Sequence, residues 1–365
     1  MRKIHLLFLV ITLCLPLSAN ASRFEDIVPN VGYDELESVT GYSTFSELVE
    51  AIINGESKDA KNLFEKILIF FTAELKSCIK YVSIIIGFAM LGACIKGVDI
   101  KITKNSAGIL FLITYSIIAV FLLGILKNCI SIASELSEEI DTFVKMTIPA
   151  YIGFVSAIMS ITNASSMEGL FLVMINVVSA FAGKVMINVL FYTGVLYIIN
   201  YMSTEIHVLK LIELVRQIMF WLLGFLLTVF AGMTGLSGIN AVGASASGMR
   251  ALKYTVGHAV PVVGGFLADS SDLIFASAKI FKNAFGTAGI IIVFAICLTP
   301  VLKLFAMGVM LKASAGLTEP FCDKRISDCI AAIGQTIIYI MVCVILICVM
   351  FILSFAVILL VGMGG

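Results

Sequence analysis

Charged residues are scarce in this sequence, and the shortage excludes a protein built from ordinary soluble domains. Only 13% of the 365 residues are charged, whereas about a quarter are charged in a typical soluble domain. Hydrophobic residues make up 60% of the chain, and the mean hydropathy is +1.08. Because a surface of this composition could not be covered with polar groups, lipid is the expected solvent for most of the chain.

A basic surplus is also missing, since 24 Lys and Arg balance 24 Asp and Glu. Proteins that bind nucleic acid carry such a surplus, so no nucleic-acid partner is expected. The sequence contains neither a GxxxxGK[ST] nor a GxGxxG phosphate-binding motif. Its three histidines form no Cys/His or Ser/His/Asp set with suitable spacing. We therefore expect no enzyme activity, no catalytic residues, no cofactor and no metal.

The N-terminus has the three parts of a secretory signal peptide. Arg2 and Lys3 precede a short apolar run, and Ala19-Asn20-Ala21 fits a cleavage site. We predict a cleaved signal peptide over residues 1–21, with an uncleaved first transmembrane helix as the alternative. Residues 22–61 then form an acidic extracytoplasmic segment, which is either a solvated spacer or a docking segment for an external partner.

Seven apolar runs approach or exceed the length of about 20 residues that a membrane span needs. They cover residues 79–95, 107–126, 147–162, 169–202, 218–236, 285–311 and 330–361. Residues 62–80 have the pattern of an interfacial amphipathic helix. We predict an all-α, polytopic transmembrane helical protein, with a first transmembrane region at 62–237 and C-terminal transmembrane helices at 285–365. The last run is long enough to tilt or break near Gly334-Gln335.

Charges between the runs indicate the orientation, because Lys and Arg are retained in the cytoplasm. The first loop is basic and should be cytoplasmic, so the mature N-terminus should be extracytoplasmic: Lys96, Lys101 and Lys104. The next connection is acidic and is expected to be an external loop, with Glu135, Glu138, Glu139 and Asp141.

Residues 169–202 are long enough to cross the membrane once or twice. Two crossings, with a turn at Gly183-Lys184, would place Lys312, Lys324 and Arg325 inside. One crossing would instead place four other basic residues inside: Arg250, Lys253, Lys279 and Lys282. We favour two crossings.

Residues 238–284 are neither plainly polar nor plainly apolar. Their first part is rich in small residues, which permit close helix packing, and Pro261 precedes Gly264-Gly265. We predict a broken or re-entrant segment here. In its second part polar residues recur at helical spacing and form one stripe: Asp269, Asp272, Lys279 and Asn283. The stripe either faces water at the membrane surface, or lines a water-filled path or docks a partner subunit.

Isolated lysines and cysteines in the apolar runs have two interpretations each. Lys184 and Lys303 are candidate functional residues because charge at membrane depth is costly, although long lysine stems also reach the interface. Most of the nine cysteines are expected to act as small hydrophobic residues. The sequence also allows a disulfide between Cys322 and Cys329.

The segment around Pro261 resembles a known family. It contains Gly248-Met249-Arg250-Ala251-Leu252-Lys253-Tyr254, then Val260-Pro261-Val262-Val263-Gly264-Gly265, then Lys282-Asn283-Ala284-Phe285-Gly286. These runs are similar to the stage III sporulation protein AE family (SpoIIIAE) of endospore-forming bacteria. The order of signal peptide, polar segment, spans and glycine-rich block also fits. The residues carried over as family signature, without a mechanistic role, are Gly248, Arg250, Lys253, Pro261, Gly264 and Gly265.

The resemblance implies a place among the SpoIIIA membrane proteins of the mother cell. With the forespore protein SpoIIQ, this set forms a channel or secretion-like complex that is needed for endospore development. An ATPase subunit of the set supplies the nucleotide chemistry. We therefore expect a non-enzymatic, multi-pass subunit in the mother-cell membrane facing the forespore, whose partners are other SpoIIIA proteins, SpoIIQ and the lipid bilayer. The alternatives are a stand-alone secondary transporter or permease, and a purely structural scaffold.

Overall fold

A computed structural model describes Glu37 and residues 45–54, 63–97, 104–159, 176–178, 180–203, 208–232 and 264–360. All regular structure in these ranges is helical, which confirms the all-α class. The helices are α3 (Phe45–Asn54), α4 (Leu63–Gly97), α5 (Lys104–Met159), the π-helix η2 (Ala180–Met186), α7 (Ile187–Met202), an unlabelled helix (Leu209–Gly232), α9 (Gly264–Thr318) and α10 (Lys324–Leu360).

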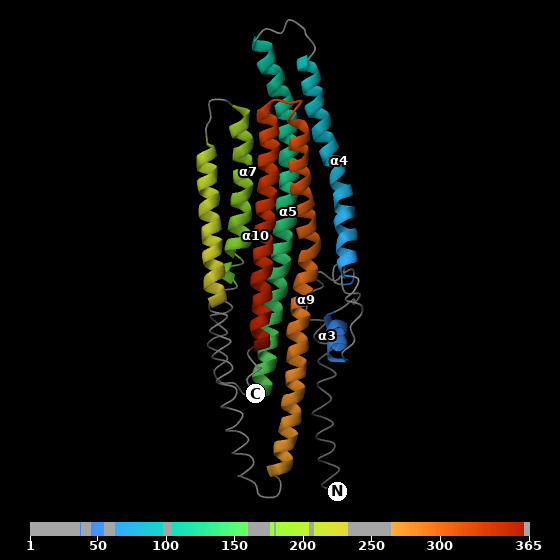
Figure 1. Cartoon of the computed structure of the whole chain (residues 1–365). Helices are drawn as coiled ribbons and strands as arrows, with labels where there is room; N and C mark the ends of the chain where they lie inside the picture. Colours follow the sequence, from blue (N-terminus) through green and yellow to red (C-terminus); the bar gives the residue numbers. More distant parts are fainter. Residues whose placement is uncertain are drawn as a thin grey trace.

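The long helices lie side by side with their axes nearly aligned, so the molecule is an elongated bundle (Figure 1). The helices α9 and α10 form a hairpin, and α5 packs against both of them. We call the end of the bundle where α9 passes into α10 the turn end. The end of α7 and the start of the helix Leu209–Gly232 lie at this same end, as do the end of α4 and the start of α5 (Figure 1).

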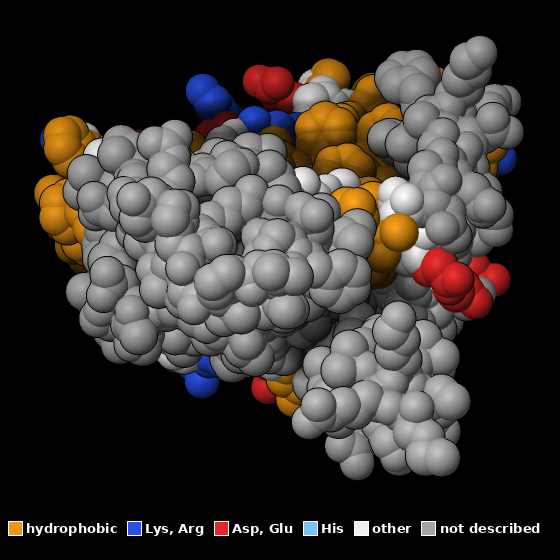
Figure 2. Space-filling model, turned by 90° about the horizontal axis from the view of Figure 1, so that it is seen from below, with side chains coloured by type: hydrophobic (Ala, Val, Ile, Leu, Met, Phe, Trp, Pro, Cys, Tyr) orange, Lys and Arg blue, Asp and Glu red, His pale blue; other side chains and the backbone are white. Residues whose placement is uncertain are grey.

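By length and composition alone, five of the described helices could cross a membrane. They cover Phe111–Thr147, Asn176–Met202, Leu209–Gly232, Asn283–Thr318 and Lys324–Ala356. Several large apolar side chains on them are exposed, among them Trp221 at 76% and Val120 at 69%. Seen from the end opposite the turn end, apolar side chains reach the outer edges of the molecule (Figure 2). Such a surface suits a lipid environment better than water.

The predicted surface helix at 62–80 and the predicted span at 79–95 are not separate elements. A single helix, α4, runs through both without a break from Leu63 to Gly97. It is not among the five candidate spans.

The predicted external loop after residue 126 is wrong, because α5 continues through it. This helix holds 56 residues and contains both predicted runs, 107–126 and 147–162, apart from the last three residues. The acidic residues Glu135, Glu138 and Glu139 are exposed, whereas Leu136 and Ile140 are buried. Their spacing gives the helix a charged side and a packed side, so the charges mark a face rather than a loop.

The predicted turn at Gly183-Lys184 is also wrong. These residues lie in η2, which continues directly into α7. Gly183 is buried, and a Cβ at this position would collide with the Ser137 side chain of α5. Lys184 points to the exposed side. Glycine is therefore needed here for close helix packing, and residues 180–202 form one continuous helical element.

The helices of the α9–α10 hairpin approach each other closely at two glycines, Gly308 and Gly334. A Cβ on Gly308 would lie 2.8 Å from Ile338 Cγ1 and 3.3 Å from the Gly334 carbonyl oxygen. Small residues let the two backbones approach. Of the two possibilities for the last run, tilting or breaking near Gly334-Gln335, the break is absent, since α10 is uninterrupted from Lys324 to Leu360. The helix α9 likewise continues through Pro300.

A short turn joins α9 to α10. The Arg325 backbone N–H donates a hydrogen bond to Asp323 Oδ1 over 3.1 Å, so Asp323 caps the first turn of α10. The Arg325 guanidinium also pairs with Asp323 and lies 3.7 Å from the centre of the Phe111 ring of α5. Ser327 donates a hydrogen bond to the Ala315 carbonyl oxygen over 2.9 Å. These contacts fix the hairpin against α5 at the turn end.

Candidate functional site

The predicted polar stripe lies in a single helix. Asp269, Asp272, Lys279 and Asn283 all belong to α9, whose backbone is helical from Gly264 onward. Their spacing therefore places them along one side of α9. Among these four, Asn283 is the residue whose side chain the structure describes.

The stripe occupies a part of α9 that extends past the rest of the hairpin. A Cβ on Gly289 of α9 would meet the ring of Phe355 of α10. From this level α9 continues for 25 residues to Gly264, whereas α10 continues for five to Leu360. At 1.5 Å per residue, α9 projects about 30 Å beyond Leu360. Figure 1 shows this projection at the end opposite the turn end. The stripe helix thus continues the axis of a candidate span.

Asn283 has an unusual polar environment. Its Oδ1 atom is buried and has no hydrogen-bond partner among the described residues. Its backbone carbonyl oxygen accepts a hydrogen bond from Thr287 Oγ1 over 2.7 Å. A buried acceptor without a partner costs about 1–3 kcal/mol. Such an atom calls for an explanation by water, an ion or a missing partner.

Two groups of α5 share this property, namely Asp141 Oδ1 and Thr147 Oγ1. The other carboxylate oxygen of Asp141 forms an ion pair of 2.7 Å with Lys145. Thr147 is 1% exposed and lies one helical turn beyond Phe143. Phe143 packs against Phe355, with ring centroids 5.9 Å apart. All three unsatisfied groups therefore lie toward the end of the bundle from which α9 projects.

We take Asn283, Asp141 and Thr147 as the candidate site. Sequence reasoning found Asn283 through the stripe, but it missed the two residues of α5. It assigned Asp141 to a loop and read Thr147 only as the start of a span. A helical projection of residues 136–147 would have shown Thr147 beside the buried Leu136, Ile140 and Phe143, whereas Asp141 falls outside this buried side.

The family-signature residues contribute little described geometry. Gly264 and Gly265 are the first residues of α9. The remaining four, Gly248, Arg250, Lys253 and Pro261, lie outside the described residues. Residues 238–263 of the predicted broken or re-entrant segment (238–284) lie there too, so a break before Gly264 stays a prediction, whereas residues 264–284 belong to the continuous helix α9.

The α3 helix belongs to the predicted acidic segment at 22–61. It packs against α9 and buries Leu48, Val49 and Ala51, while Glu50 is exposed. Part of the segment is therefore attached to the bundle.

The cysteine pairing differs from the sequence-based expectation. Cys322 and Cys329 are both free, and the disulfide joins Cys297 of α9 to Cys348 of α10. Burial raises the pKa of the Cys322 thiol, and the Asp323 carboxylate raises it further. The protonated thiol donates a hydrogen bond of 3.2 Å to the Ala89 carbonyl oxygen of α4.

The buried hydroxyl of Tyr115, near the turn end, already has hydrogen-bond partners. Tyr115 of α5 donates a hydrogen bond to the Ile198 carbonyl oxygen of α7, and its oxygen lies 3.3 Å from the Cys329 sulfur of α10. Within the described part of the chain, no three His, Cys, Asp or Glu side chains gather as a metal site would require. The Tyr115 contacts link α5, α7 and α10 and have a structural role.

Comparison with known proteins gives one consistent result. Residues 43–362 match the family described as Stage III sporulation protein AE. A relative of that name from Bacillus subtilis (strain 168) is 24% identical over 250 residues. The matched region covers 68% of this chain and 63% of the relative. No solved structure matches the chain.

Proposed function

The chain belongs to the stage III sporulation protein AE family, and from this premise we propose that it is a non-enzymatic, multi-pass membrane subunit of a channel or secretion-like complex between mother cell and forespore. Its place is the mother-cell membrane facing the forespore. Its partners are other SpoIIIA proteins and, through the complex, SpoIIQ. The observation that carries the proposal is the family match, which spans every described helix from α3 to α10.

The distribution of charge supports one orientation of the bundle. The connections at the turn end are flanked by basic residues, namely Lys96, Lys104, Lys210, Lys324 and Arg325. Cytoplasmic loops are enriched in Lys and Arg, so we place the turn end in the cytoplasm. The acidic α3 then lies toward the extracytoplasmic side, as does the projecting part of α9. Lys324 and Arg325 remain inside although the turn at Gly183-Lys184 is absent, because the predicted loop after residue 126 is absent as well and the two corrections cancel. This arrangement agrees with a signal peptide and an exported N-terminus.

The same orientation places the stripe where it could meet a partner outside the mother-cell cytoplasm. The projecting part of α9 would present Asp272 about 17 Å and Asp269 about 21 Å beyond Asn283. A subunit of an assembly between two membranes needs surface of this kind. A transporter that works alone has no need of it.

A stand-alone transporter is the second candidate, and the unsatisfied groups favour it to some degree. Buried polar atoms such as Asn283 Oδ1 and Asp141 Oδ1 are found at solute sites in transporters. Transporter sites are also built from discontinuous helices. Among the described helices, α9 and α10 are continuous, so this second feature is not seen there.

The stripe provides the test. We expect the double substitution Asp269→Asn and Asp272→Asn to lower the yield of heat-resistant spores by about tenfold or more in the organism that makes this chain. It should also reduce recovery of other SpoIIIA proteins with the tagged chain in mild detergent, because a charged docking contact is lost. Both quantities are measured in one culture.

The matched control replaces two exposed carboxylates away from the stripe, Glu138→Gln on α5 and Glu319→Gln at the turn end. It removes the same charge and should leave spore yield and partner recovery unchanged. Recovery of the wild-type chain without any membrane partner, together with solute uptake by purified chain in vesicles, would overturn the subunit proposal in favour of the transporter.

A further inference from the structure

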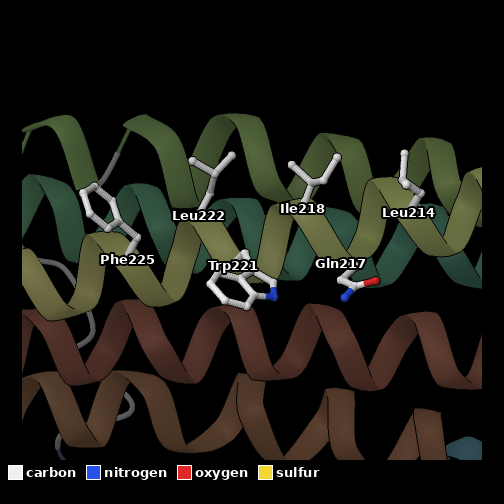
Figure 3. A pocket seen from close by; sticks show the side chains of 6 residues that line it. All are labelled: Leu214, Gln217, Ile218, Trp221, Leu222 and Phe225. Carbon is white, nitrogen blue, oxygen red and sulfur yellow. The ribbon is translucent and has the colours of Figure 1, made fainter.

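The helix Leu209–Gly232 is the least packed of the candidate spans. In its most apolar stretch of 18 residues only 11% of the residues are buried, compared with 33–50% in the same stretch of the other four candidate spans. Its outward face forms an open groove of about 520 Å³, lined by Leu214, Gln217, Ile218, Trp221, Leu222 and Phe225. Figure 3 shows that all six side chains come from this one helix, with Gln217 and Trp221 together along one edge.

Four residues of this face form a straight seam. Gln217, Trp221, Gly224 and Thr228 are all exposed and follow one another at spacings of four, three and four. The average spacing of about 3.7 residues is close to the 3.6 residues of one helical turn, so the four positions lie along one side of the helix. A Cβ on Gly224 would meet no atom within 4 Å. The seam therefore combines a large side chain, a hollow and a polar amide.

The amide of Gln217 is the group that lipid cannot satisfy. It is exposed within a candidate span, and it has no hydrogen-bond partner among the described residues. Hydrocarbon offers neither donors nor acceptors, so a polar side chain facing it is stabilised by another helix. The nearest charge, Arg216, is turned inward to the Tyr197 hydroxyl at 3.2 Å and to the Tyr339 ring at 4.6 Å. No charge lies between Gln217 and Thr228, but toward the turn end the same side of the helix continues into Glu213 and Lys210, which are both exposed and opposite in charge.

We propose that this seam is the interface between two copies of this chain, packed through parallel Leu209–Gly232 helices. The inference rests on the proposed function in one respect, namely that the chain is inserted in a membrane. Every inserted copy then has the same orientation, and a two-fold axis along the membrane normal brings residues of equal depth together.

Equal depth makes the seam complementary to itself. A glutamine amide carries both donors and an acceptor, so Gln217 of one copy can bond to Gln217 of the other. Gly224 meets Gly224, where the absent side chains let the backbones approach. Trp221 lies between these two levels and covers the contact from the side. A carboxylate or an amine at position 217 would repel its own copy, whereas an amide does not.

Cross-linking in vesicles of bacterial lipid tests the geometry of the full chain. Gly224→Cys should give an oxidant-dependent dimer, because the two thiols would lie opposite each other. The control is Gly87→Cys on α4, which is another exposed glycine with no atom within 4 Å of its Cβ position. It should give no dimer beyond that of the wild-type chain, whose native cysteines set the background.

Energy transfer between two labelled pools then measures the strength of association. Gln217→Leu should weaken the dimer about fivefold through the lost amide pair, and Gly224→Leu should weaken it about tenfold or more by filling the hollow. Gly87→Leu should leave association unchanged.

Three results would overturn the dimer. They are a single copy at every protein-to-lipid ratio, equal cross-linking at positions 87 and 224, and cross-linking at 224 to a different membrane protein without self-linking. Alkaline extraction separates this failure from a failure of the proposed function. A chain that stays in the membrane but does not self-associate contradicts only the dimer, whereas a chain released by alkali contradicts the membrane role itself.

Discussion

The α9–α10 hairpin and the helix Leu209–Gly232 are packed very differently. All three helices are apolar enough to cross a membrane, yet about half of the most apolar stretch of α9 and α10 is buried, at 44% and 50%, compared with 11% for Leu209–Gly232. Hydrophobicity does not decide which helices form the core, because Asn176–Met202 is the least apolar of the five candidate spans and is nevertheless 50% buried. In lipid, where both environments are apolar, close contact decides it.

Glycines show the difference at the level of single residues. Gly308 and Gly334 in the hairpin lie where a side chain would strike the facing helix. Gly224 in the helix Leu209–Gly232 has open space around it. Gly308 and Gly334 are already used for packing within the chain, whereas Gly224 of the helix Leu209–Gly232 is available for a partner.

Removal of the disulfide should weaken the hairpin most. The bond between Cys297 and Cys348 closes a loop of about 50 residues, and loops of this size contribute about 2–4 kcal/mol. We expect Cys297→Ala with Cys348→Ala to lower the free energy of unfolding in detergent by that amount. Reduction of the wild-type chain should have the same effect.

The control for this prediction removes two buried free cysteines, Cys78 and Cys129. The variant Cys78→Ala with Cys129→Ala loses comparable packing without opening a loop, and it should remain sensitive to reduction. Mass spectrometry of unreduced peptides checks the bond directly. Two separate peptides for positions 297 and 348 would contradict it.

Overpacking of the hairpin should have the next largest effect. Gly308→Leu forces a side chain toward Ile338 and the Gly334 carbonyl, and such changes cost about 1–3 kcal/mol. Gly316→Leu, in the same helix but with no atom within 4 Å of its Cβ position, should cost less than about 0.5 kcal/mol. Thermal unfolding in detergent measures both. Equal losses would show that α9 and α10 do not approach each other at Gly308.

Sequence reasoning predicted the apolar, all-α class of the protein and the two C-terminal helices. It wrongly placed a loop or a turn where charged residues interrupt an apolar run. Glu135, Glu138 and Glu139 are compatible with a continuous helix because they share its exposed side. Lys184 is compatible with one because η2 turns it outward. A charge within an apolar run reports the direction of a side chain as often as it reports a loop.

The candidate site was only partly predictable for a related reason. The stripe on α9 follows from spacing along one helix, so Asn283 could be found. Its companions Asp141 and Thr147 come from α5, and their burial depends on how α5 packs. The disulfide is similar, since Cys297 and Cys348 are distant in sequence but lie at similar distances from the turn that joins α9 to α10.

The smallest expected change in unfolding free energy concerns two neighbouring residues of the helix Leu209–Gly232. Leu223 is fully buried and Leu222 is 40% exposed, although the two are adjacent. Leu223→Ala leaves a cavity and should cost about 2 kcal/mol, whereas Leu222→Ala should change the unfolding free energy of the dilute chain by less than about 0.5 kcal/mol. If a second copy packs along the seam, Trp221→Ala should lose stability only at high protein-to-lipid ratio, where dimers form, because Trp221 is 76% exposed in the single chain. A loss that is independent of this ratio, or equal losses in the Leu222 and Leu223 variants, would mean that the exposed side of this helix packs within its own chain, and the contrast with the hairpin would then fail.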